Sequence, residues 1–357
     1  MREFRTLSLR KKYKRSVMTI GEKTEMSDER LDDFMGRANA TYYGNCNPFS
    51  DFITSPEISQ IFGEILGGWV AVVKQHLPRG PFMLAEAGPG RGTLMSDALR
   101  LLQRVPDIMA AMEVHLVETS PRLRQIQKEA LAAFDIKPVW HDRIESLPVI
   151  PFVFLGNEFL DALPVRQFVR CSEVACGWKE RWVRGENFVL HEASDLPAEL
   201  LLREAEEGEI VEISPAMLHV AEWLGNRLKN GMGAALLIDY GPSRSAPGDS
   251  LQALHKGRPA DPLMKPGEAD LTVHVDFEAI GRKASSTGAR CFGPMTQGNF
   301  LSELGASARL EQLCRAAPDQ AAALRTGLDR LMAPDRMGHL FKVLALTSPD
   351  MMKPPGF

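Results

Sequence analysis

The stretch EAGPGRGTL, residues Glu86 to Leu94, lies between an apolar run and a helical pattern and carries glycines at alternate positions, Gly88, Gly90 and Gly92. Glycine adopts left-handed backbone conformations without a side-chain penalty, so such a turn can bring backbone N–H groups close to a ligand at a helix N-terminus. A dinucleotide-binding turn, G-x-G-x-x-G counted from Gly88, would need a glycine where Thr93 stands. The turn therefore predicts a ligand site and leaves an NAD oxidoreductase as a distant alternative.

The chain on either side of this turn alternates between short apolar runs and amphipathic helical patterns. Strands are predicted for FMLAEAG, EVHLVETS, IKPVWHD, PFVFLGNE and GAALLIDYG, and a sixth and seventh for ARCFGPM and HLFKVLALTS. Helices are predicted for TLMSDALRLLQRV and RLRQIQKEALAAF between them. This order is typical of parallel strands joined by crossover helices, which predicts an α/β, doubly wound sheet covered on both faces.

The domain organisation follows from changes in pattern along the chain. Residues 1–78 are predicted to form a basic arm and an N-terminal helical lid segment, with the sheet domain spanning 79–357. The insertion 165–214 has period-two alternation, which predicts an antiparallel meander on the substrate side, and the insertion 242–275 is predicted to be a long loop. The arm carries seven basic residues among its first fifteen, which fits a presequence, a disordered arm or an upstream start codon.

Composition narrows the classes of partner. The 357 residues include 42 basic and 46 acidic ones, a net charge of -4 that favours neither nucleic acid nor an anionic membrane. No apolar stretch is long enough to insert into a membrane. The five cysteines and eight histidines show no zinc-site spacing, so no metal is expected. A small cofactor and a protein partner are expected, and a homodimer is left open.

Polar residues stand where the predicted strands end. Glu118 follows the second strand, Asp142 the third, and Asn157, Glu158 and Asp161 the fourth. In an open α/β sheet the carboxyl ends of the strands border the ligand crevice, which favours chemical roles for these side chains. The structural alternatives are that Glu118 caps the following helix, Asp142 belongs to a turn and Asp161 caps a short helix.

The pattern Glu86-x-Gly88-x-Gly90-x-Gly92, with Glu118 on the next strand tip, resembles the S-adenosylmethionine pocket of seven-stranded class I methyltransferases. Longer segments resemble the MidA-like family, which includes the mitochondrial complex I assembly methyltransferase: YYGNCNPFSDFITSPEISQIFGE, EAGPGRGTLMSD, VETSPRLRQIQ, WHDRIESLP, GNEFLDALPV, IDYGP, DLTVHVDF and QGNFLSELG. The resemblance implies a Rossmann-like class I methyltransferase fold with S-adenosyl-L-methionine as cofactor. The implied cofactor-binding residues are Glu86, Gly88, Gly90, Gly92, Glu118 and Asp142.

The same resemblance implies methylation of an arginine on a protein substrate, a complex I subunit or a bacterial equivalent. Asn157, Glu158 and Asp161 would then lie on the acceptor side. A carboxylate at Glu158 could accept a two-pronged hydrogen bond from a guanidinium and offset its repulsion by the cationic sulfonium. The alternatives are a methyltransferase with another acceptor and a non-catalytic assembly chaperone that binds the cofactor. The implied location is the bacterial cytoplasm, or alternatively the mitochondrial matrix.

Overall fold

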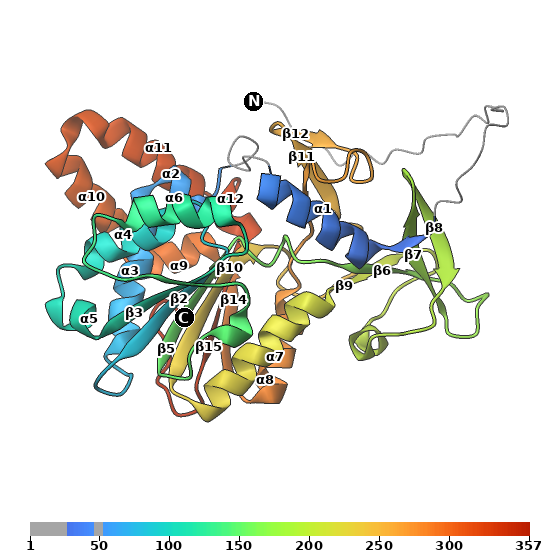
Figure 1. Cartoon of the computed structure of the whole chain (residues 1–357), viewed down its shortest axis with the longest axis horizontal. Coiled ribbons are helices and arrows are strands. Elements are labelled where there is room, and N and C mark those ends of the chain that lie inside the picture. The colour runs from blue at the N-terminus through green and yellow to red at the C-terminus, as the bar shows by residue number, and fades with distance from the viewer. Residues whose placement is uncertain (1–26, 46–52) are drawn as a thin grey trace.

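A seven-stranded sheet with helices on both faces forms the centre of the protein (Figure 1). The computed structural model describes residues 27–45 and 53–357, so the predicted basic arm lies outside the described residues. In spatial order the strands are β14 (Arg290–Thr296), β15 (Phe341–Thr347), β10 (Gly233–Tyr240), β5 (Phe152–Asn157), β2 (Phe82–Ala87), β3 (Met112–Val117) and β4 (Val139–His141). The doubly wound α/β sheet is confirmed.

One strand departs from the expected parallel arrangement. β10, β5, β2, β3 and β4 are parallel to one another, whereas β15 runs antiparallel to both β10 and β14. Two parallel strands need a crossover connection, but antiparallel strands do not. The chain reaches β15 from the short helix α12 (Met337–Leu340), which ends directly before it. The sheet is therefore mixed at this edge and parallel where the glycine turn lies.

The strands are apolar because both faces of the sheet are covered. Every residue of β2 is buried, and successive side chains of a strand point to opposite faces. Met83 and Ala85 accordingly join a core with α1, α7 and α8, while Phe82 and Leu84 join a second core with α3, α4 and α11. The helices are α1 (Leu31–Asn45), α2 (Ser55–Ile58), α3 (Gln60–Lys74), α4 (Thr93–Leu102), α5 (Pro106–Ala111), α6 (Pro121–Leu131), α7 (Pro215–Asn230), α8 (Phe277–Thr287), α9 (Gln297–Glu303), α10 (Ala306–Ala316), α11 (Ala321–Met332) and α12.

The N-terminal helices belong to the body of the protein. α3 packs so closely on α4 that a Cβ atom built on Gly67 would lie 2.7 Å from the carbonyl oxygen of Ala98. The helical conformation is interrupted between α2 and α3 at Ser59, which has an extended backbone. The side chain of Ser59 accepts a hydrogen bond from the N–H of Ile61 and so caps α3. In the described part of the chain, no helix combines the length and apolar character needed to cross a membrane.

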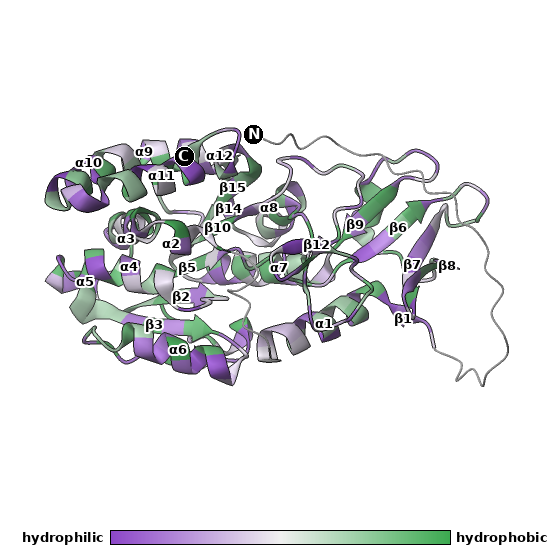
Figure 2. Cartoon of the chain, turned by 90° about the horizontal axis from the view of Figure 1, so that it is seen from above, coloured by the Kyte–Doolittle hydropathy of each residue, from purple (hydrophilic) through white to green (hydrophobic). Residues whose placement is uncertain are grey.

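The two insertions form small sheets. An antiparallel sheet at one end of the molecule contains β1 (Glu29–Arg30), β6 (Arg166–Arg170), β7 (Trp178–Arg184), β8 (Asn187–Glu192) and β9 (Ile210–Ile213) (Figures 1 and 2). Its pairs β6–β7 and β7–β8 form the meander expected within 165–214. The expectation of a loop over 242–275 is wrong in part. That segment contains a three-stranded sheet of β11 (Gln252–His255), β12 (Arg258–Ala260) and β13 (Asp270–Thr272), because apolar residues such as Ala253 and Leu271 pack into the core.

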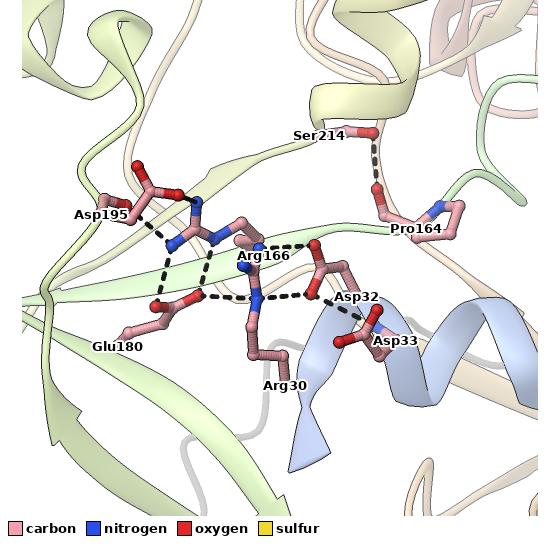
Figure 3. A network of polar contacts seen from close by, with 8 residues as sticks. All are labelled: Arg30, Asp32, Asp33, Pro164, Arg166, Glu180, Asp195 and Ser214. Atoms are coloured by element: carbon pink, nitrogen blue, oxygen red, sulfur yellow. Dashed lines mark hydrogen bonds and ion pairs between the residues drawn. The ribbon is translucent and has the colours of Figure 1, made fainter.

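A buried ion pair connects two strands of the small sheet, β6 and β7 (Figure 3). Arg166, with 4% of its side chain exposed, donates to both carboxylate oxygens of Glu180 at 2.7 and 2.9 Å, and to the carbonyl oxygen of Asp195 at 2.8 Å. Arg30, directly before α1, lies 3.9 Å from the same Glu180 carboxylate. The hydroxyl of Ser214 donates a hydrogen bond to the carbonyl oxygen of Pro164, just before β6. Arg30 also pairs with Asp32 of α1 at 2.8 Å, so the network links the small sheet to α1.

Candidate active site

A cavity of about 370 Å³ lies at the carboxyl ends of β2, β3 and β5, within the range of about 300–1,000 Å³ usual for ligand sites. Its walls come from α1, residues 54–57, the glycine turn and the segments that follow β3, β4 and β5. Seven of the nine predicted site residues line it: Glu86, Gly88, Gly90, Glu118, Asp142, Asn157 and Glu158. The sheet thus brings together residues from four separate strand ends.

The glycine turn has the backbone conformation that its sequence implies. Gly88, Gly90 and Gly92 have φ angles of 63°, 54° and 80°, which L-residues with a side chain rarely adopt. A Cβ atom on Gly88 would also come within 3.2 Å of the ring of Phe159. Gly92 does not line the cavity; it is the N-cap of α4. The turn therefore presents backbone at the cavity and starts a helix beside it.

Glu118 is 8% exposed and lines the cavity just beyond the end of β3. Its two carboxylate oxygens accept hydrogen bonds from the N–H of Ser120 at 2.8 Å and from Nε2 of Gln127 at 3.2 Å. Burial raises the pKa of Glu118, and these hydrogen bonds oppose the rise. The N-cap of α6 is Ser120, whose hydroxyl accepts from the N–H of Leu123. The side chain of Glu118 is therefore not needed as the helix cap.

Asp142 lies at the rim of the cavity. Its side chain is 78% exposed and forms an ion pair with Arg124 of α6 at 2.5 Å. The neighbouring Trp140 donates its indole N–H to Gln127 and is not among the described residues that line the cavity. Asp142 is thus accessible to a ligand from one side while Arg124 holds it from the other.

Two buried oxygens in the cavity wall lack a hydrogen-bond donor among the described residues. They are Oε2 of Glu86, which is 3% exposed, and Oδ1 of Asn157, which is 7% exposed. Burial raises the pKa of Glu86 to about 8. Leaving such acceptors unpaired costs about 1–3 kcal/mol each, so buried polar groups are nearly always paired. Both positions fit donor groups of a bound molecule, such as the amino group of an amino-acid moiety.

Glu158 turns the chain out of β5 into the cavity wall. Its φ angle of 48° is unusual for a residue with a side chain and such outliers cluster at functional sites. One carboxylate oxygen accepts from the N–H of Ser55 at 2.7 Å and from Nδ2 of Asn157 at 3.2 Å. Burial raises the pKa of Glu158. The carboxylate is fixed in position and keeps acceptor capacity toward the cavity.

Asp161 does not line the cavity that Glu158 lines. The segment after β5 forms a turn rather than the helical turn that would place both acids on one side. Asp239, fully buried at the end of β10, holds this turn by accepting from the N–H groups of Leu160 and Asp161. Burial and the nearby Asp239 and Asp270 raise the pKa of Asp161. Asp161 therefore lies behind the wall, in a buried acidic cluster.

Sequence analysis missed Gln127. The buried residues of α6 are Leu123, Gln127 and Leu131, at the spacing of one helix face, so Gln127 occupies a position where an apolar residue is expected. That misplaced amide in an otherwise apolar stripe is the signal that could have identified it. In the described part of the chain, no group of three or more His, Cys, Asp or Glu residues is arranged to hold a metal ion.

Comparisons with known proteins agree with this geometry. A family model described as "Putative S-adenosyl-L-methionine-dependent methyltransferase" matches residues 65–295. The zebrafish protein arginine methyltransferase NDUFAF7 is 34% identical over 328 residues, covering 83% of this chain and 76% of its own length. The mouse NDUFAF7 is 36% identical over 330 residues, covering 83% and 74%.

The fold is also similar to the crystal structure of a Burkholderia thailandensis protein, described as a likely methyl transferase, bound to S-adenosyl-homocysteine. The TM-score between the two chains is 0.75 and their sequence identity is 27%. The match covers 92% of this chain and 90% of that one. A native crystal structure of a COG1565 superfamily protein from the same organism has a TM-score of 0.77 to this chain at 28% sequence identity. The fold is that of class I methyltransferases, and the cofactor is S-adenosyl-L-methionine.

Proposed function

Because this chain belongs to the family of S-adenosyl-L-methionine-dependent methyltransferases, we propose that it methylates an arginine of a protein substrate. The acceptor is suggested by relatives named protein arginine methyltransferases, at about a third identity over most of the chain. The cofactor supplies a methyl group on a positively charged sulfur. The remaining question is how this chain's residues would bind the cofactor and bring a cationic acceptor to it.

The cofactor end of the cavity would be formed by the glycine turn and three acids. The carboxylate of Glu118 suits two vicinal ribose hydroxyls, because it is an acceptor-only group with two oxygens. Glu86 suits the amino group of the methionine moiety, since its Oε2 has no donor among the described residues. Asp142 at the rim suits the exocyclic amino group of adenine. Gly88 and Gly90 let the backbone approach between them.

The residues at the acceptor end of the cavity are the main support for arginine as the methyl acceptor. Glu158 and Asn157 line the same cavity as Glu118 and Glu86, and Oδ1 of Asn157 has no donor among the described residues. An arginine brought there would place a guanidinium beside a sulfonium, two positive charges in a confined space. A fixed carboxylate at Glu158 would offset this repulsion and orient one guanidinium nitrogen toward the methyl group. The guanidinium of free arginine stays protonated at neutral pH, so its proton would pass to Glu158 or to water as the new N–C bond forms and the bond between the methyl carbon and the sulfur breaks.

The test is transfer of labelled methyl from the cofactor into protein, followed by identification of the modified residue. Glu158→Gln should abolish most of the transfer while binding of S-adenosylhomocysteine persists. Glu129→Gln, on the exposed side of α6, is the matched control and should leave both unchanged.

Three outcomes would contradict parts of the proposal. Label on a residue other than arginine would replace the acceptor. Tight cofactor binding without any transfer would favour an assembly chaperone, as would a Glu158→Gln variant with full biological activity. Failure to bind the cofactor would contradict the site itself. A respiratory complex I subunit, or its bacterial equivalent, is the first substrate to examine.

A further inference from the structure

Gln127 is a fully buried amide at the centre of the apolar face of α6. Burying an amide without hydrogen bonds is costly, and an apolar side chain would fill the same space without that cost. The polar groups of Gln127 therefore need partners, and those partners lie at the cofactor end of the cavity.

The amide makes three hydrogen bonds. Its Nε2 donates to the carbonyl oxygen of Gly90 at 2.8 Å and to Oε2 of Glu118 at 3.2 Å. Its Oε1 accepts from the indole N–H of Trp140, on β4, at 2.8 Å. An indole N–H can only donate and the two other partners can only accept, so the three contacts determine which way the amide faces.

These contacts join two walls of the cavity. Gly90 belongs to the turn after β2, Glu118 lies beyond the end of β3, and both line the cavity. The N–H of Ser120 holds the other oxygen of Glu118 at 2.8 Å. Each carboxylate oxygen has two lone pairs, so the carboxylate keeps acceptor capacity for a ligand. The hydrogen bond from Gln127 also favours the charged form of Glu118 against the burial that raises its pKa.

We propose that Gln127, oriented by Trp140, is a positioning residue that fixes the carboxylate of Glu118 and the carbonyl of Gly90 to receive the ribose of the cofactor. The proposal rests on the proposed role of Glu118 as the ribose-binding acid. Gln127 itself does not line the cavity, so it acts on the cofactor only through these two residues.

The test compares the affinity of the full chain for S-adenosylhomocysteine with that for its 2′,3′-dideoxy analogue, both by calorimetry. The ratio of the two affinities measures ribose recognition, and a general loss of stability would lower both affinities without changing it. Gln127→Met keeps the length of the side chain and removes all three hydrogen bonds. Because a hydrogen bond to a charged group is worth about a factor of ten or more, the ratio should fall about tenfold.

Two further variants keep the test decisive. Gln125→Met changes the same residue type on the exposed side of α6 and should leave the ratio unchanged. Trp140→Phe removes the donor that orients the amide and keeps an aromatic ring, and the ratio should fall in the same direction by a smaller factor. If Gln127→Met does not fold, the Trp140→Phe result decides: an unchanged ratio there overturns the proposal.

Glu118→Ala separates this inference from the assignment on which it rests. If Glu118→Ala leaves the ratio unchanged, Glu118 does not bind the ribose and both ideas fail. If Glu118→Ala lowers the ratio but Gln127→Met does not, only the positioning role fails. In the double variant, Gln127→Met should add no further loss of the ratio, and an additive loss would mean that Gln127 does not act through Glu118.

Discussion

Binding of the cofactor should release a proton from Glu86. The pKa of this buried carboxyl is raised to about 8. Glu86 lines the cavity, and its buried Oε2 has no donor among the described residues. At pH 6 about one carboxyl in a hundred with such a pKa is ionised, and at pH 8 about half are. If the amino group of the cofactor needs the carboxylate as its partner, affinity should rise roughly fiftyfold between these pH values.

Calorimetry with S-adenosylhomocysteine tests this prediction in two ways. The affinity is measured at pH 6, 7 and 8 for the native chain and for Glu86→Gln, and the heat at pH 7 is compared in buffers of different ionisation enthalpy. The native chain should release nearly one proton at pH 7, and Glu86→Gln should remove that release and most of the pH dependence. A constant ratio of the two affinities from pH 6 to 8, with no proton released, would refute the role of Glu86.

The same carboxyl makes an independent prediction for the stability of the ligand-free chain. Its folded pKa of about 8 lies above its ordinary value, so the folded state holds the proton more tightly and stability is lost as the pH rises. The loss attributable to Glu86 should begin near its ordinary pKa and continue to about pH 8, at about 1.4 kcal/mol per pH unit. Denaturation curves of Glu86→Gln should lack this slope, and an identical slope in both proteins would contradict the burial argument.

Three other predictions concern separate parts of the protein. The rate of methyl transfer should rise with pH through the raised pKa of Glu158, because only the ionised carboxylate can accept two hydrogen bonds from a guanidinium. A pH profile of the rate, measured with saturating substrate and cofactor, checks this prediction. A flat profile would contradict it. Arg166→Met should destabilise the fold by about 3 kcal/mol, because it removes both close hydrogen bonds to the buried Glu180 and leaves that carboxylate only Arg30, 3.9 Å away. Replacing Arg166 and Glu180 together by Met should recover much of the loss in urea denaturation. Gly67→Ala should lower the free energy of unfolding by about 1–3 kcal/mol, because the new Cβ would lie 2.7 Å from a carbonyl oxygen of α4. Gly68→Ala is the control: the nearest atom to its Cβ would be 4.0 Å away, so this substitution should not lower the stability.

Local sequence determined the strands and the glycine turn. Residues such as those of β2 are apolar because both faces of the sheet are covered, and that pattern is visible without coordinates. The positions of Gly88, Gly90 and Gly92 were likewise informative, since each adopts a positive φ angle that favours glycine. From the strand ends alone, the sequence also placed Glu118, Asp142, Asn157 and Glu158 at one edge of the sheet, and it placed Asp161 there with them.

Only the tertiary structure decided how those side chains are used. Asp161 and Glu158 are three residues apart, yet Glu158 lines the cavity and Asp161 lies behind its wall. The reason is that Asp239, on β10 and far along the sequence, holds the turn between them. Gln127 joins the turn after β2 to the end of β3 through an amide whose orientation depends on Trp140 from a third strand. Strand patterns arise from burial, which acts on each residue separately. Hydrogen-bond partners far apart in the sequence depend on distances that exist only once the sheet has formed.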